Sequence, residues 1–132
     1  MATKASANTP EADAQAFNSA YELNASFKRS PVEMFTMQLC SALWNYWDTI
    51  VSRSTDRKFT ESLRPELTSA HSKRRKIYLD RMARREMNDE DDEVEFQKTQ
   101  ASAQSMADEI YEEYTSDNKA GAENLAGWLG EC

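Results

Sequence analysis

The sequence has few of the residues that break helices. Only three glycines and three prolines occur among its 132 residues, which is too few for the many turns of a small all-β fold. Three glycines also leave no room for most glycine-dependent motifs, and no Walker loop, Rossmann fingerprint or nucleophile elbow is present. We therefore expect an all-α protein built from long helices.

Metal-binding and catalytic side chains are equally scarce. The single histidine, His71, excludes a di-iron site built from two Glu-x-x-His motifs. The two cysteines, Cys40 and Cys132, have neither metal-ligand spacing nor the pattern of a disulfide framework. We expect Cys40 to be a small buried side chain and Cys132, the last residue, to be exposed. The sequence thus predicts no catalytic residue, no cofactor and no metal, and a reducing, cytoplasmic location.

Long hydrophobic runs are missing as well. The most apolar stretch, residues 31–53, contains Glu33, Gln38, Asn45 and Asp48, each of which is costly in hydrocarbon. The N-terminus has no apolar segment typical of a secretory signal. We expect no contact with a membrane.

A helix from Pro31 to about Arg53 is the element around which we expect the fold to be organised. Ser30 is a candidate N-cap, Pro31 suits the first helical position, and Glu33 would complete a capping box. The spacing of apolar residues by three and four predicts a helix over the whole stretch.

Two neighbouring apolar stripes follow this helix. One stripe is Val32, Phe35, Leu39, Leu43, Tyr46 and Ile50, and the other is Met37, Cys40, Trp44, Trp47 and Val51. Together they are wider than the apolar face of an ordinary surface helix, which predicts a core helix covered by others. A second interpretation is that Trp44 and Trp47 form an interface with another chain.

Four main helices and two short ones are expected in a single helical bundle. Besides the central one, the pattern predicts helices at about 10–28, 65–87 and 91–114, with short helices near 59–64 and 122–130. Thr9 and Pro10 form the start signal of the first helix. We expect that helix to pack antiparallel on the central one, because the connection between them is short.

The predicted domain organisation has three parts. Residues 1–9 form a disordered arm, residues 10–116 form the bundle, and residues 117–132 form a tail with a short amphipathic helix. Leu125, Trp128 and Leu129 in the tail are typical anchors for a hydrophobic groove. The tail either docks on a partner or folds back over the end of its own bundle.

Charge is divided unevenly along the chain. The net charge is −7, yet residues 61–85 carry eight basic and three acidic side chains, whereas residues 86–132 carry two basic and fourteen acidic. The basic cluster consists of Lys73, Arg74, Arg75, Lys76, Arg81, Arg84 and Arg85. Such cations can bind phosphates. They can also pair with the acidic run at 88–95, within the chain or between copies.

His71 lies in the segment Ser69-Ala-His-Ser-Lys-Arg-Arg75 on a predicted helix. This segment resembles the phosphorylated motif of histidine phosphotransfer domains, which are four-helix bundles with an exposed histidine. Arg74 stands at the usual lysine position, but Arg75 replaces the glycine that normally follows. The resemblance implies a phosphotransfer role for His71.

Three functions are therefore open. The favoured one is a non-enzymatic interaction or structural protein that acts as an adaptor, a regulator or a subunit of a larger assembly such as a scaffold or virion. Its partner is another protein or a second copy of the chain. The alternatives are a nucleic-acid-associated helical subunit that uses the basic cluster, and a phosphotransfer protein that uses His71. The sequence alone does not name the partner or the oligomeric state.

Overall fold

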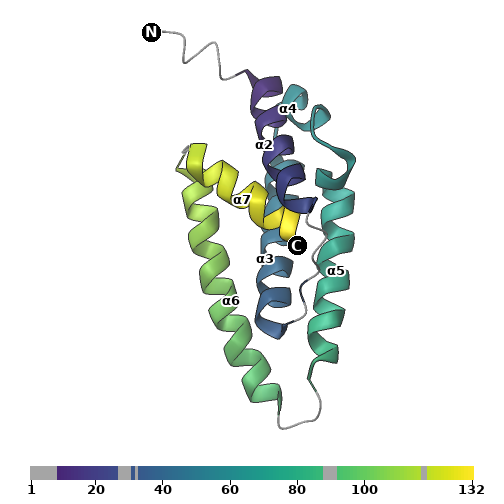
Figure 1. Ribbon diagram of the computed structural model, residues 1–132, viewed down its shortest axis with the longest axis vertical. Helices are drawn as coiled ribbons and strands as arrows, with labels where there is room; N and C mark the ends of the chain where they lie inside the picture. Colours follow the sequence, from purple (N-terminus) through teal and green to yellow (C-terminus); the bar gives the residue numbers. More distant parts are fainter. Residues whose placement is uncertain (1–8, 27–30, 32, 88–91, 117–118) are drawn as a thin grey trace.

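The computed structural model is built from helices (Figure 1). It describes residues 9–26, 31, 33–87, 92–116 and 119–132. The elements are α2 (Pro10–Ala25), α3 (Met34–Arg53), α4 (Arg57–Glu61), the 3₁₀ helix η1 (Pro65–Leu67), α5 (Ser69–Arg85), α6 (Asp92–Thr115) and α7 (Lys119–Glu131). No strand occurs within these ranges, so the predicted all-α bundle is confirmed. The predicted disordered arm lies outside the described residues, except for Thr9.

Helix α3 is the core element, as its two apolar stripes predict. Its fully buried side chains are Met37, Leu39, Cys40, Leu43, Trp44 and Trp47. Trp47 contacts two other elements in the core. Its ring stacks on Phe17 of α2 with centroids 4.2 Å apart, and its indole N–H donates to the Leu67 carbonyl at 2.9 Å. A buried polar group that is hydrogen-bonded avoids the desolvation penalty of an unpaired one.

Helices α5 and α6 flank α3 on opposite sides, and neither lies mainly against the other (Figure 1). Helix α5 runs antiparallel to α3, and the Ser41 hydroxyl of α3 donates to Asp80 of α5 at 2.5 Å. Helix α6 runs parallel to α3, and the Gln38 amide donates to the Phe96 carbonyl of α6 at 3.1 Å. The arrangement leaves the outer faces of α5 and α6 on opposite flanks of the molecule.

Helix α7 covers the remaining side of the core together with α2. Helix α2 lies mainly against α7 and contacts α3 through the stack of Phe17 on Trp47. The predicted hairpin of α2 with the central helix is therefore only partly right. The close approach depends on glycine, because a Cβ on Gly130 would lie 2.4 Å from the Tyr21 carbonyl oxygen of α2. The segment expected to be a separate tail is therefore an integral part of the bundle.

A disulfide joins Cys40 of α3 to Cys132, with Cα atoms 5.4 Å apart. The predictions of two free cysteines and of an exposed Cys132 are wrong, since Cys132 is 7% exposed. The physical reason is that α7 returns across the bundle and ends beside the middle of α3 (Figure 1). The bond spans 92 residues, and no local spacing rule detects such a pair.

The start of α3 also differs from the prediction. The helix begins at Met34, with Glu33 in an extended conformation as N-cap and without a side-chain capping bond. Pro31 is not helical, and Ser30 lies outside the described residues. The helix starts where Met34 begins to pack on the core, so tertiary contact rather than the local capping signal sets its first residue.

Candidate interaction surface

Helix α5 presents one basic and partly apolar stripe to solvent. Thr68 caps its N-terminus by accepting a hydrogen bond from the His71 amide. The buried residues Ser72, Leu79 and Ala83 lie on the face toward α3. Residues three and four apart share a helix face, and the opposite face carries the side chains that we call the α5 outer stripe. These are Arg74, Ile77, Tyr78, Arg81 and Arg85.

Large side chains of the α5 outer stripe are unusually open to water. Ile77 is 50% exposed and Tyr78 is 48% exposed. Arg74 and Arg81 are exposed, and the structure shows neither in a hydrogen bond or ion pair with another described residue. Among the described residues, the hydrogen-bond partner that the structure shows for the Arg85 side chain is the Met82 sulfur, at 3.9 Å. The stripe thus combines free positive charge with exposed apolar surface.

The other candidate cations serve contacts within the chain. Lys73 pairs with Asp48 at 3.1 Å, and Lys76 pairs with Asp80 at 2.8 Å. The Arg75 guanidinium donates to the Cys132 carbonyl and lies 5.0 Å from the Tyr78 ring centroid. Lys73 and Arg75 thereby connect α5 to α3 and to the C-terminal residue, whereas the Lys76–Asp80 pair lies within α5.

Arg84 of the basic cluster forms an ion pair with the acidic run at 88–95 of its own chain. It pairs with Glu93 at 3.0 Å, and its guanidinium lies 3.9 Å from the Phe96 ring centroid. Pairing within the chain is thus found at this one position of the run, and residues 88–91 lie outside the described part.

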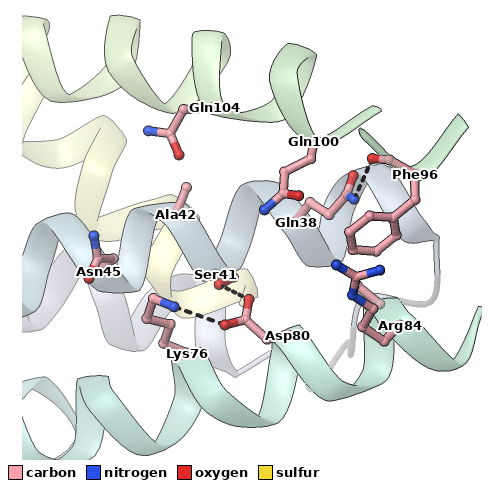
Figure 2. Close-up of a pocket in the computed structure, with 11 residues that line it drawn as sticks. Gln38, Ser41, Ala42, Asn45, Lys76, Asp80, Arg84, Phe96, Gln100 and Gln104 are labelled. Carbon is pink, nitrogen blue, oxygen red and sulfur yellow. Dashed lines mark hydrogen bonds and ion pairs between the residues drawn. The ribbon is translucent and has the colours of Figure 1, made fainter. Parts of the chain in front are cut away.

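A polar cleft of about 270 Å³ lies between α3, α5 and α6. Asp80 is one of its lining residues, and Figure 2 shows it bonded both to Ser41 and to Lys76. Gln38, which is 6% exposed, donates to Phe96, while its Oε1 has no hydrogen-bond partner among the described residues. Asp80 already shares its charge with Lys76, so the main effect of this network is to fix α5 against α3.

The predicted aromatic interface is not on the surface. Trp44 and Trp47 are 1% and 0% exposed, and Leu125 and Leu129 are 0% and 1% exposed. Trp128 is partly buried and packs against the same core. The four buried side chains cannot contact a partner while the bundle is folded, because their own chain covers them. The tail docks on its own bundle, which answers a question that the sequence left open.

His71 lies in the first turn of α5 and is half-buried. Its ring meets Trp44 edge-on with centroids 5.7 Å apart. Burial, followed by the nearby charges of Arg74 and Arg75, lowers the pKa of His71 below its ordinary value. A phosphotransfer histidine needs an exposed imidazole, so this placement gives no support to that role, which stays a prediction.

An acidic surface that the sequence analysis did not single out lies at the end of α6. We call Glu109, Glu112 and Glu113 the α6 acidic end; all three are exposed. None of them forms an ion pair with a described residue. The last turn of α6 holds no basic residue, and this local sequence signal could have revealed the acidic end.

Tyr46 of α3 and Asp108 of α6 form a hydrogen bond that is sensitive to alkaline pH. The bond to Asp108, and to a lesser degree burial, raises the pKa of Tyr46 from 10.0 to about 12. Because the pKa of Tyr46 is higher in the folded chain than in the unfolded one, the hydrogen bond stabilises the fold fully below pH 10.0. This stabilisation is lost as the pH rises toward about 12. We expect Tyr46→Phe to unfold at lower denaturant concentration than the wild type at neutral pH, with the gap closing over this window. Urea unfolding at several pH values measures it, and a gap that stays constant would contradict the assignment.

Comparisons with protein-family models, with curated proteins and with solved structures find no match to this chain. No described helix is both long and apolar enough to cross a membrane. Within the described ranges, no group of three or more histidine, cysteine, aspartate or glutamate side chains could hold a metal ion. The function must therefore be inferred from the surface of the chain itself, where the α5 outer stripe combines exposed apolar and basic side chains.

Proposed function

We propose that this protein is a non-enzymatic interaction protein, an adaptor, regulator or subunit of a larger assembly, that binds a protein partner through the α5 outer stripe. One observation carries the proposal. Arg74 and Arg81, which form no ion pair with a described residue, lie beside Ile77 and Tyr78, two large side chains about half exposed to water.

The composition of the stripe supports a protein partner. Tyrosine and arginine are enriched in interface cores and among the residues that contribute most to binding. A single exposed apolar side chain is ordinary, but Ile77 and Tyr78 lie on either side of one stripe, each three or four positions from Arg74 and Arg81. The polar network on the inner face of α5 supports the proposal further, since it holds the stripe in one orientation.

Paired serine substitutions test this function. The variant Ile77→Ser/Tyr78→Ser removes the apolar part of the stripe. Its matched control is Leu23→Ser/Val94→Ser, because Leu23 and Val94 are exposed apolar residues on other helices, at 67% and 69%. Each protein is immobilised and incubated with extract of its source cells. We expect the wild type and the control to retain the same partner and the stripe variant to lose it. Identical retention by all three proteins would overturn the proposal.

A second candidate function follows from the position of three arginines. Arg74, Arg81 and Arg85 lie along one exposed stripe, an arrangement that could follow a phosphate backbone. The net charge of −7 opposes it, because an acidic protein repels nucleic acid at long range. Fluorescence anisotropy with labelled RNA and duplex DNA at low salt decides. Absence of binding removes this candidate.

The cellular location stays a prediction. The sequence favoured the cytoplasm because it displays neither a disulfide framework nor an apolar segment typical of a secretory signal. The Cys40–Cys132 disulfide weighs against that argument, since cytosolic thiols are kept reduced and disulfides persist mainly in oxidising compartments.

A further inference from the structure

We propose that the α5 outer stripe of one copy binds the α6 acidic end of a second copy, so that the chains associate head to tail. The inference rests on the proposed function, because it uses the same stripe and names the partner that occupies it.

The two surfaces have opposite charge, and their exposed charged side chains have few partners among the described residues. Arg74 and Arg81 of the stripe, and Glu109 and Glu112 of the acidic end, are exposed. None of these four side chains forms an ion pair with a described residue of its own chain. Complementary potentials of this kind determine partner choice and accelerate encounter.

The position of the glutamates is unfavourable for the isolated chain. Glu112 and Glu113 lie in the last turn of α6, at the negative end of the helix dipole, and no basic residue compensates them there. A cation in the last turn would stabilise a helix, whereas an acidic group there opposes it. An arginine from a second copy would supply the missing positive charge.

The arrangement of helices keeps the α5 outer stripe away from the α6 acidic end of the same molecule. Figure 1 shows α5 and α6 on opposite flanks of the bundle, with α3 between them. The outer faces of the two helices therefore point away from each other, and only another copy can bring them together. An interface between two different surfaces of the same chain is heterologous, and its repetition produces an open chain or a closed ring.

The stripe is better suited to a protein than to nucleic acid. Ile77 and Tyr78 offer apolar area that a phosphate backbone does not use. The acidic end belongs to every copy, so it is present at the same concentration as the stripe itself.

Light scattering on the purified wild type tests the association directly. We expect an average mass above the monomer mass of 15.1 kDa, rising with protein concentration. The mass should fall toward 15.1 kDa at high salt, because the Debye length shortens from about 10 Å at 0.1 M to about 3 Å at 1 M. A monomer at every concentration in low salt would overturn the inference.

Charge reversal identifies the two surfaces. We expect Arg74→Glu/Arg81→Glu and Glu109→Lys/Glu112→Lys each to be monomeric alone. The variant with all four substitutions should associate again, because its reversed surfaces are complementary. An equimolar mixture of the two double variants should also associate. Reversed double variants that still associate like the wild type, or a fourfold variant that stays monomeric, would contradict the proposed interface.

A matched control separates local from global charge. Arg53→Glu/Lys58→Glu changes the net charge of −7 by the same four units as the stripe variant, but at exposed positions on or beside α3 and α4. It should keep the wild-type mass. Loss of association in this control would overturn the assignment to α5.

The extract experiment distinguishes failure of this inference from failure of the proposed function. A pure protein that is monomeric, but retains another protein through Ile77 and Tyr78, contradicts only the second copy as partner. A monomer with no stripe-dependent partner in extract contradicts both proposals.

Discussion

Removal of the Cys40–Cys132 disulfide is expected to lower the free energy of unfolding by about 4 to 5 kcal/mol, because a closed loop of that length restricts the unfolded chain. The two residues are 92 positions apart. With a urea dependence of about 2 kcal/mol per molar for a small protein, the unfolding midpoint should fall by about 2 M. Urea unfolding of the wild type and of Cys40→Ala, followed by circular dichroism, measures the shift.

The partner cysteine supplies the control. Cys132→Ala should cause nearly the same loss as Cys40→Ala, and the double variant should lose little more than either, because the crosslink is broken only once. The reduced wild type should unfold close to the single variants. A reduced wild type that unfolds at the same urea concentration as the oxidised protein would contradict the expected stabilisation.

Gly130→Ala is expected to lower the free energy of unfolding by about 2 kcal/mol through a steric clash between α7 and α2. The added Cβ would lie 2.4 Å from the Tyr21 carbonyl oxygen and 3.0 Å from the Ala25 backbone nitrogen. Backbone atoms cannot rotate away as a side chain can, so α7 must shift. The gain of about 1 kcal/mol for alanine over glycine in a helix offsets only part of the loss. Thermal and urea unfolding measure the effect.

Gly127→Ala is the matched control on the same helix. Its Cβ would meet only the Asn24 side chain, with the nearest atom, Nδ2, at 3.0 Å. That amide can adjust, although it donates to the Ala20 carbonyl at 2.9 Å. We expect a change within about 1 kcal/mol of zero, because the helix propensity of alanine offsets the adjustment. Equal losses for Gly127→Ala and Gly130→Ala would show that backbone contact does not explain the effect.

Two contacts fix helix α7 in place. The disulfide and the close contact at Gly130 both hold α7 over the core that contains Trp44 and Trp47. The aromatic interior is thus closed to a partner while the bundle is folded.

The sequence by itself determined the fold class and most helix positions, because these depend on local patterns. Thr9 and Pro10 correctly mark the start of α2, since the side chain of an N-cap satisfies an amide in the first turn. The apolar stripes correctly place Trp44 and Trp47 on a core helix. The basic cluster is also visible, because its members are close in sequence.

Only the tertiary structure decided which of these residues can reach a partner. Lys73 and Lys76 belong to the same basic cluster as Arg74 and Arg81, yet the first two form ion pairs and the other two form none with a described residue. The burial of Leu129 and the pairing of Cys132 likewise follow from the return of α7 across the bundle. The physical reason is that such contacts join residues far apart in the chain, whereas helix periodicity carries information only about near neighbours.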